Sequence, residues 1–593
     1  MVSLAASIFF AVCYLALAGG FYFRKKSDEK FYGITWLALI FVMIQCYHVF
    51  IAAVINVVHI PVNLVTFGIF DLIAAVYFWL PVYKKKETQK YIYGIVDIVF
   101  LILAVVVVAW FAKNRFYGFH LSINYKTVDP APRFREAMDL VNDQSISRMF
   151  YAQVVNGTMI ELLAPFEQID YYYRFYVLSD VVQLLVSGVM FFGVIRKYIK
   201  GKFLAVAGVL ASLIFLLGYP LNSTIYGFTY LGMSLTLVAM LLVVTDLFLE
   251  EKINKKFNIF LLMLGCHAMF QCYALFMPVT YLAIIFAIFL KQYRKKILIS
   301  KDTVLTCLAV FLFPCISGLW YTYMDVFVKD DVSVGSAISA EGAIYRDLYS
   351  NFLPFLPLAI YGFAKLVKDR KNKLISWFAP FFAIFTFGMF ALAYHNRSVS
   401  TYYFYKDYYM IWLIICMLGF YGVSRMAKEA RTVTACYIGT WAFVLVMFVS
   451  GLETRIYNNN NLFMDSAKGP QYNDLVCFNI NTMKEPPYAE PRMAMAHYVY
   501  QKLIETGKTD KPVPCAYNDD QFYWYEGVTN QRLSDYMYWK SDYDTFKTNL
   551  EKNCDYVSVM IDSRIYVDNQ EYFDSMEKVF ENEIGFVARV NKD

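Results

Sequence analysis

Charged residues are scarce in this chain. Only 17% of its 593 residues are Asp, Glu, Lys or Arg, whereas 59% are hydrophobic and 19% aromatic. This composition excludes an ordinary soluble multidomain protein and predicts a membrane protein. The net charge of +6 comes mostly from short basic clusters between apolar runs, where such residues orient helices, so it gives little support to a nucleic-acid partner.

The chain also lacks the cysteine spacing of a metal site and the pattern of a removable leader. Most of its eleven cysteines fall inside apolar runs, where a thiol behaves as a small hydrophobe. Only Cys477, Cys515 and Cys554 lie in the polar C-terminal region, so at most one disulfide can form there. The run from Val2 to about Phe23 has no preceding basic residue and no A-x-A site after it, so we expect a retained helix.

Apolar runs long enough to cross the hydrocarbon layer predict about fourteen transmembrane helices. They cover approximately residues 2–22, 34–57, 61–82, 91–112, 174–195, 203–220, 224–248, 257–272, 274–291, 303–323, 351–367, 374–395, 406–424 and 432–452. Basic clusters fall in alternate loops, at 24–26, 84–86, 196–202, 252–256, 291–296, 365–373 and 425–431. Because Lys and Arg collect on the cytoplasmic side, we expect the N-terminus, the other loops and everything after residue 452 to lie outside a plasma membrane.

The region after residue 452 is polar and mixes two periodicities. Tyr556–Ile561 and Gly585–Val590 are strand-like, and Asn569–Phe580 is helix-like, so we expect a small extracytoplasmic α/β domain. The predicted organisation is an N-terminal transmembrane extension (1–90), a transmembrane core (91–452) with a large outer loop (113–173), and the α/β domain (453–593).

The large outer loop carries the first candidate catalytic residue. Asp129 precedes Pro130, whose ring disfavours helical backbone at Asp129, so we expect a turn just before an amphipathic helix. The carboxylate is then placed either to cap the helix or to act as a catalytic group. The spacing of residues by itself favours a capping or solvated aspartate. No spacing requires a metal, but a divalent ion is compatible with Asp129 and one further acid of the loop: Asp139, Asp143, Glu161, Glu167 or Asp170.

The outer loop at 395–405 and the start of the next span offer positive charge. Arg397 can bind a phosphate bidentately and Lys406 as a point charge, while Tyr402 and Tyr403 suit sugars or headgroups. The same residues are typical of an aromatic belt with a snorkelling lysine. Glu341, among small residues in the outer loop 324–350, fits either a mobile loop that orders over substrate or a plain connector.

The segment Asp129-Pro130-Ala131-Pro132-Arg133-Phe134 follows a span and continues into amphipathic sequence, and in this it resembles the first outer loop of GT-C superfamily glycosyltransferases. The resemblance covers the arrangement of about residues 91–593 and implies transfer of a sugar from a polyprenyl-phosphate-linked donor to a cell-surface glycan, polymer or lipid acceptor. It implies that Asp129 is the general base. Arg133 stands where some relatives carry His and cannot act as a base, which leaves it charge stabilisation. The Lys- and Tyr-rich composition favours a bacterial origin.

Two other functions fit a chain with many spans. A transporter or flippase of lipid-linked saccharides is suggested by ionisable residues within or near spans, namely Asp71, Asp97, Asp180 and His267. Pairing with tyrosine hydroxyls would satisfy them without transport, and no matching halves stand out. A polysaccharide polymerase shares many spans and large basic outer loops. Dependence of activity on Asp129 separates both alternatives from the glycosyltransferase.

Overall fold

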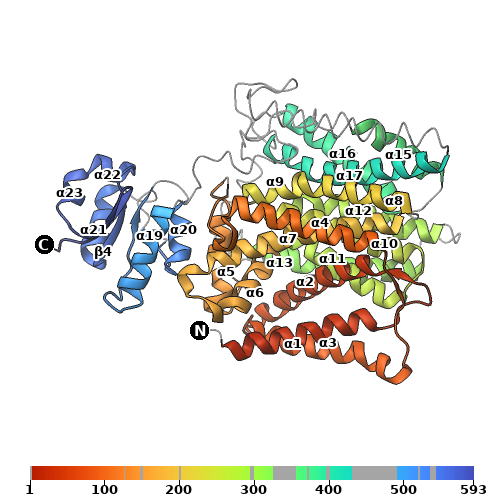
Figure 1. The fold of residues 1–593 in the computed structure, drawn as a ribbon, viewed down its shortest axis with the longest axis horizontal. Helices are drawn as coiled ribbons and strands as arrows, with labels where there is room; N and C mark the ends of the chain where they lie inside the picture. Colours follow the sequence, from red (N-terminus) through yellow and green to blue (C-terminus); the bar gives the residue numbers. More distant parts are fainter. Residues whose placement is uncertain are drawn as a thin grey trace.

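The computed structural model describes residues 3–125, 127–146, 151–198, 202–293, 300–324, 355–369, 373–395, 401–429, 490–517, 521–533 and 542–592. Most of these residues are helical. The long helices run side by side as a bundle, and a smaller domain with a β-sheet lies beyond one end of it (Figure 1).

The bundle contains the long apolar helices of the chain. They are α1 (Leu4–Phe23), α2 (Gly33–Val57), α3 (Leu64–Lys85), α4 (Ile95–Arg115), α7 (Tyr173–Tyr198), α8 (Lys202–Leu217), α9 (Tyr219–Tyr226), α10 (Thr229–Leu249), α11 (Lys255–Cys272), α12 (Met277–Tyr293), α13 (Lys301–Tyr323), α15 (Leu356–Lys368), α16 (Ile375–His395) and α17 (Thr401–Glu429). Within the described residues, eleven segments are long and apolar enough to cross a membrane. The polytopic helical architecture is therefore confirmed. The number fourteen stays a prediction, because α11 and α15 are not among the eleven and 432–452 lies outside the described residues.

Burial divides these helices into a centre and a periphery. The whole apolar window of α10 is buried, whereas only about a third of the windows of α1, α3 and α4 is. Large apolar side chains on the peripheral helices are open, including Leu15, Ile73 and Ile95. A helix with its backbone hydrogen bonds satisfied internally and such an outer surface is suited to contact with lipid.

The basic loops meet at one end of the bundle. Arg196 at the end of α7 pairs with Asp97 at the start of α4 at 2.7 Å, and Lys252 after α10 pairs with Glu29 at 2.8 Å. At this end the two-residue strands β1 (Phe31–Tyr32) and β2 (Tyr91–Ile92) also pair in parallel. The first residues of α1 and the C-terminal domain lie at the opposite end (Figure 1). The alternation of basic loops in the sequence thus corresponds to one basic end.

Two short helices, which lie between α4 and α7 in the sequence, cover the end of the bundle opposite to the basic loops. They are α5 (Pro130–Asp143) and α6 (Tyr151–Leu163), which pack against each other. On α5, Ala131, Phe134, Ala137 and Met138 are buried, which is the apolar stripe of an amphipathic helix. The amphipathic helix expected after Asp129 is therefore confirmed.

The C-terminal domain has a four-stranded sheet of order β3-β4-β6-β5. Its strands are β3 (Cys515–Ala516), β4 (Tyr556–Met560), β5 (Glu577–Asn582) and β6 (Gly585–Arg589), and its helices are α19 (Glu490–Tyr498), α20 (Gln521–Val528), α21 (Tyr543–Asn553), α22 (Arg564–Asp568) and α23 (Gln570–Asp574). Strand β3 runs parallel to β4, and the other pairs are antiparallel.

Two strand predictions in this domain are confirmed, by β4 and β6, and one helix prediction is wrong. The expected helix 569–580 ends with α23 at Asp574, and β5 follows it. Strand β5 forms because its backbone pairs with β6, with Phe580 opposite Val587, and such non-local pairing outweighs local periodicity. Cys515 and Cys554 are buried free thiols, and Cys477 lies outside the described residues.

Candidate functional site

Asp129 lies at the end of the bundle opposite to the basic loops, where the chain enters α5. The loop before α5 is fixed to the turn between α9 and α10, because the Thr127 hydroxyl donates to the Tyr226 carbonyl at 2.5 Å. Gly227 in this turn has φ +80°, and a Cβ there would lie 2.0 Å from Cγ of Pro130. Only glycine allows so close an approach with that backbone. The turn therefore sets the position of Pro130 and of Asp129 beside it.

The backbone of Asp129 differs from the expectation. Its φ of −52° and ψ of −30° are helical, and its side chain makes no capping hydrogen bond. The turn closes one residue earlier than expected, because the Ala131 N–H donates to the Val128 carbonyl at 2.8 Å. The prediction of non-helical backbone and the capping interpretation are both wrong. Within the described residues, the carboxylate has no hydrogen-bonding partner that would give it a structural role.

Three of the predicted site residues form one electrostatic cluster, namely Asp129, Arg133 and Lys406. Asp129 is an exposed residue, but many protein atoms surround its carboxylate, and this desolvation raises its pKa above the usual value of 3.8. The charges of Lys406 and then Arg133 act in the opposite direction and lower this pKa. A carboxylate from the first loop and cations from α5 and α17 are thus close enough to influence each other.

Lys406 is enclosed by aromatic side chains. It lies in the first turns of α17, is only 3% exposed, and donates from Nζ to the Tyr230 hydroxyl at 3.0 Å. Nζ also lies 4.9 Å from the ring centroid of Phe228 and 5.9 Å from that of Tyr273. Aromatic faces attract a cation in such positions. The snorkelling interpretation is therefore wrong, because the amine is directed into the protein.

Arg133 lies one turn after Asp129 on α5. It forms an ion pair with Glu136 on the same helix, with Nη1 2.8 Å from Oε2. Burial acts to lower the arginine pKa, but the Glu136 carboxylate and the neighbouring Tyr230 and Tyr176 hydroxyls raise it above its usual value. Arg133 is consequently a permanent positive charge at this site and cannot accept a proton.

The structure describes the other predicted site residues only in part. Tyr403 is half-buried in the first turn of α17, and Tyr402 lies in the same turn but its side chain is outside the described residues. Arg397 and Glu341 are also outside them. The predicted roles of these residues in binding phosphate or substrate stay predictions.

Sequence reasoning missed several residues of this site. Tyr230 contacts Lys406 through its hydroxyl, and the only signal for it is its position just after Gly227. Asp407 is completely buried beside the hydroxyl of Thr386 on α16. The sequence does contain a signal for Asp407, because a Lys-Asp pair at the start of an apolar span is costly unless both groups are directed into the protein.

The other acids of the first loop have protein partners. Asp139 and Asp143 pair with Arg532, Glu167 pairs with Arg174, Asp170 pairs with His497, and Glu161 accepts from the Leu64 N–H. Within the described ranges, no three His, Cys, Asp or Glu side chains converge as metal ligands. The divalent metal considered for Asp129 stays a prediction.

The C-terminal domain packs on the helix that carries Asp129 and Arg133. The ring of Trp524 on α20 lies 5.7 Å from that of Phe134 on α5 and is stacked 6.0 Å from Tyr125. Arg135 on α5 pairs with the buried Glu526 at 3.2 Å. Helix α5 is therefore fixed between the bundle and the C-terminal domain.

A polar cavity of about 550 Å³ lies near the far end of α5. Its lining includes Asn63, Asn142, Glu161 and Arg532. Burial raises the pKa of Glu161 to about 8, so this carboxyl group titrates near neutrality. A larger cavity of about 850 Å³ lies between α1, α2, α3 and α11 at the basic end, remote from Asp129.

The four ionisable residues that the sequence places within or near the spans, Asp71, Asp97, Asp180 and His267, each have a partner. Asp71 pairs with His48 at 2.9 Å, and Asp97 with Arg196 at 2.7 Å. Asp180 accepts from the Tyr125 hydroxyl at 2.7 Å, as expected of tyrosine, and His267 lies 3.0 Å from the Ser317 hydroxyl. Pairing of this kind offsets the cost of polar groups in a low-dielectric bundle.

Comparison with known proteins gives no family for this chain, since no family model matches it and no curated protein matches it.

Proposed function

We propose that the protein is a membrane glycosyltransferase that moves a sugar from a polyprenyl-phosphate-linked donor to a hydroxyl group of a cell-surface glycan, polymer or lipid. The observation that carries this proposal is the cluster of Asp129, Arg133 and Lys406. Asp129 and Arg133 lie one turn apart at the start of α5, and Lys406 comes from α17, a distant part of the chain, at the same end of the bundle. A carboxylate beside two cations suits a reaction in which a hydroxyl loses a proton and a phosphate leaves.

The chemistry assigns a role to each residue. The acceptor oxygen attacks the anomeric carbon of the sugar while the bond from that carbon to the phosphate oxygen breaks. Asp129 takes the proton of the hydroxyl, and its raised pKa makes it a stronger base than an ordinary aspartate. Lys406 and Arg133 stabilise the negative charge that develops on the departing phosphate. Tyr230 and Tyr273 beside Lys406 are partly exposed and offer aromatic surface on which a sugar ring can pack.

The proposed membrane orientation is supported by the difference between the two ends of the bundle. The positive-inside rule places the basic end in the cytoplasm of a bacterial plasma membrane. The cluster and the C-terminal domain then lie outside, which is where an extracytoplasmic acceptor would be reached.

The transporter alternative receives less support. It relied on unpaired charge within the spans, whereas Asp71, Asp97 and Asp180 each have a partner. The polymerase alternative needs arginine-dependent chemistry in the outer loops and does not use the Asp129 carboxylate.

Transfer of radiolabelled sugar by the purified protein in lipid tests the proposal. We expect Asp129→Asn to lower transfer by about 10²–10⁴-fold, the usual contribution of a general base. The matched control is Glu167→Gln, which removes a carboxylate that pairs with Arg174 at the same end of the bundle, and we expect it to retain transfer. Size-exclusion chromatography and thermal unfolding establish that both variants fold. Normal transfer by Asp129→Asn, or no transfer by wild type from any donor, contradicts the proposal.

A further inference from the structure

The cavity at the basic end has an apolar wall and a polar rim. It lies between α1, α2, α3 and α11, and its volume of about 850 Å³ is typical of a ligand site. Leu17, Met43, Ala74, Phe260 and Leu264 contribute to the apolar wall. Helices α1 and α3 both have large apolar side chains open to the surroundings, so the cavity lies at the periphery of the bundle.

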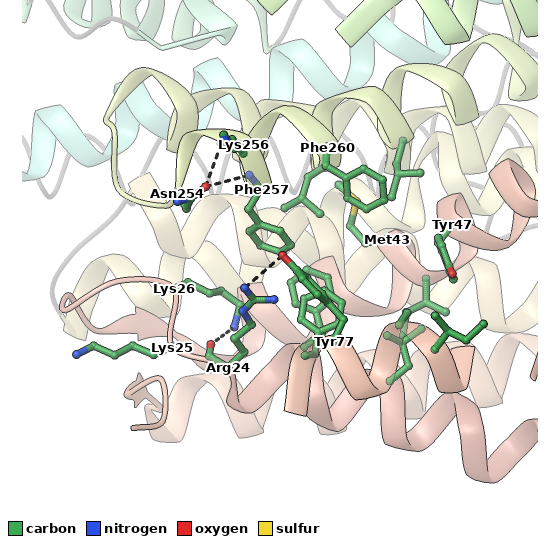
Figure 2. A pocket seen from close by; sticks show the side chains of 18 residues that line it. Arg24, Lys25, Lys26, Met43, Tyr47, Tyr77, Asn254, Lys256, Phe257 and Phe260 are labelled. Carbon is green, nitrogen blue, oxygen red and sulfur yellow. Dashed lines mark hydrogen bonds between the residues drawn. The ribbon is translucent and has the colours of Figure 1, made fainter. Parts of the chain in front are cut away.

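Arg24 lines this cavity and has no carboxylate partner in the part of the chain that the structure describes. Its Nη2 donates to the Tyr77 hydroxyl at 3.4 Å, and its guanidinium lies 4.4 Å from the Tyr77 ring and 6.0 Å from the Phe257 ring (Figure 2). Its Nη1 is buried and has no hydrogen-bond acceptor among the described residues. Leaving a charged donor buried and unsatisfied is costly. An anion at this position would remove the cost.

Lys26 adds a second cation to the same rim. Its Nζ donates to the carbonyls of Tyr22 and Arg24 and to the Tyr91 hydroxyl, which are all neutral groups. Burial, and then the charge of Arg24, lower the pKa of Lys26 to about 7. Crowding of two cations without a carboxylate is unfavourable, and a bound anion reverses that effect.

Lys25, at the same end of the bundle, differs from Arg24 and Lys26 because it has carboxylate partners. It also lines the cavity, but it pairs with Asp28 and with Glu87, both at 2.8 Å, and its side chain extends away from Tyr77 (Figure 2). Among these three lining residues, Lys25 is thus neutralised by carboxylates, whereas the described contacts of Arg24 and Lys26 are with neutral groups.

We propose that this cavity binds an anionic membrane phospholipid, with the phosphate at Arg24 and Lys26 and an acyl chain along the apolar wall. A guanidinium binds a phosphate through two parallel hydrogen bonds, which supplies the acceptor that Nη1 lacks. The rim lies just beyond the C-terminal end of α1, where lipid headgroups meet the end of a span. A small soluble anion would match the rim but leave the apolar wall without contacts. The site is separate from Asp129 and does not depend on the proposed transferase activity.

Native mass spectrometry of the delipidated full-length protein in detergent tests this site. We expect phosphatidylglycerol to bind at least tenfold more tightly than phosphatidylcholine, and Arg24→Gln to lower phosphatidylglycerol affinity at least tenfold. Lys26→Gln should act in the same direction and serves as the second variant if Arg24→Gln does not fold. The matched pair is Lys256→Gln, which removes a charge that lines the cavity, and Lys255→Gln, which removes the neighbouring charge that pairs with Asp302 outside it. We expect only the first of this pair to weaken binding.

Contact with the acyl chain is tested separately. Ala74→Leu fills part of the apolar wall without changing charge, and we expect it to weaken phosphatidylglycerol binding as well. Equal affinity for the two phospholipids, or equal effects of Arg24→Gln and Lys255→Gln, overturns the proposal. Full competition by inorganic phosphate shows a simple anion site, and tighter binding of polyprenyl phosphate than of phosphatidylglycerol shows a site for that lipid. Either result overturns the assignment to a membrane phospholipid.

Discussion

Replacing Gly227 with alanine tests whether the turn between α9 and α10 positions Asp129. A Cβ at this position would lie 2.0 Å from Cγ of Pro130. Carbon atoms in contact are normally about 3.5–4.0 Å apart, so Pro130 has to retreat by roughly 1.5 Å, and the adjoining Asp129 moves with it. A displacement of about 1 Å at a reacting group can lower a rate by about 10²-fold. We therefore expect Gly227→Ala to lose sugar transfer to that extent.

The matched control is Gly118→Ala. Gly118 has φ +67°, close to the +80° of Gly227, but a Cβ there would meet no atom within 4 Å. Both substitutions force an alanine into left-handed backbone at a cost of about 1–2 kcal/mol. Overpacking against Pro130 adds about 1–3 kcal/mol in Gly227→Ala alone. The free energy of unfolding should therefore fall by about 2–5 kcal/mol in Gly227→Ala and by about 1–2 kcal/mol in the control.

Unfolding in mixed micelles at increasing SDS fraction measures the difference in stability, and the radiolabel assay measures transfer. The stability comparison does not require activity, so it tests the contact with Pro130 even if the proposed reaction is wrong. Equal losses in the two variants would show that the turn does not press on Pro130 and would refute the reasoning.

Two predictions concern pH. Arg133 lowers the pKa of Asp129, so Arg133→Gln should shift the acidic limb of the pH profile of transfer to higher pH, while Arg135→Gln should not; an unshifted limb in Arg133→Gln contradicts the assigned coupling. Hydrogen bonding from Lys592 contributes most to lowering the pKa of Asp555 to about 2. The folded domain gains stability above pH 3.8 and loses it as pH falls towards 2. The rate of pepsin cleavage of the full-length protein, normalised to that of an unfolded substrate, should rise as pH falls over that interval. Asp555→Asn should flatten this pH dependence. The same pH dependence in Asp555→Asn and wild type contradicts the role assigned to Asp555.

Hydropathy and charge alternation are enough to predict the bundle, because they depend on local sequence. Apolar length identifies most spans, and the described parts of the alternate basic loops lie at one end, where Arg196 pairs with Asp97. The same information indicates that Asp129 and Lys406 lie at the opposite end. It does not specify which face of α17 is directed inward, so the choice between a snorkelling and a buried Lys406 could only be made from the packed structure.

Pairing between distant segments explains the remaining differences. Strand β5 exists because it pairs with β6, and a polar run such as Glu577–Asn582 has no strand periodicity of its own. The helical backbone of Asp129 likewise occurs in a loop that is held by the Gly227 turn, whereas the pre-proline rule describes an unconstrained chain. The contact between Tyr230 and Lys406 likewise joins two distant segments, and the position of Tyr230 just after Gly227 does not reveal this contact.

The C-terminal domain contacts the helix that carries part of the candidate site, although the two are far apart in the sequence. Trp524 packs on Phe134, and Glu526 pairs with Arg135, so α20 contacts the first two turns of α5. Those same turns begin at Asp129 and contain Arg133. At the other end of α5, Arg532 pairs with Asp139 and Asp143. The domain therefore contacts both ends of the helix that carries the carboxylate and one of its cations. Because a displacement of α5 would move these two groups against Lys406 on α17, the domain acts as part of the frame that holds the cluster together.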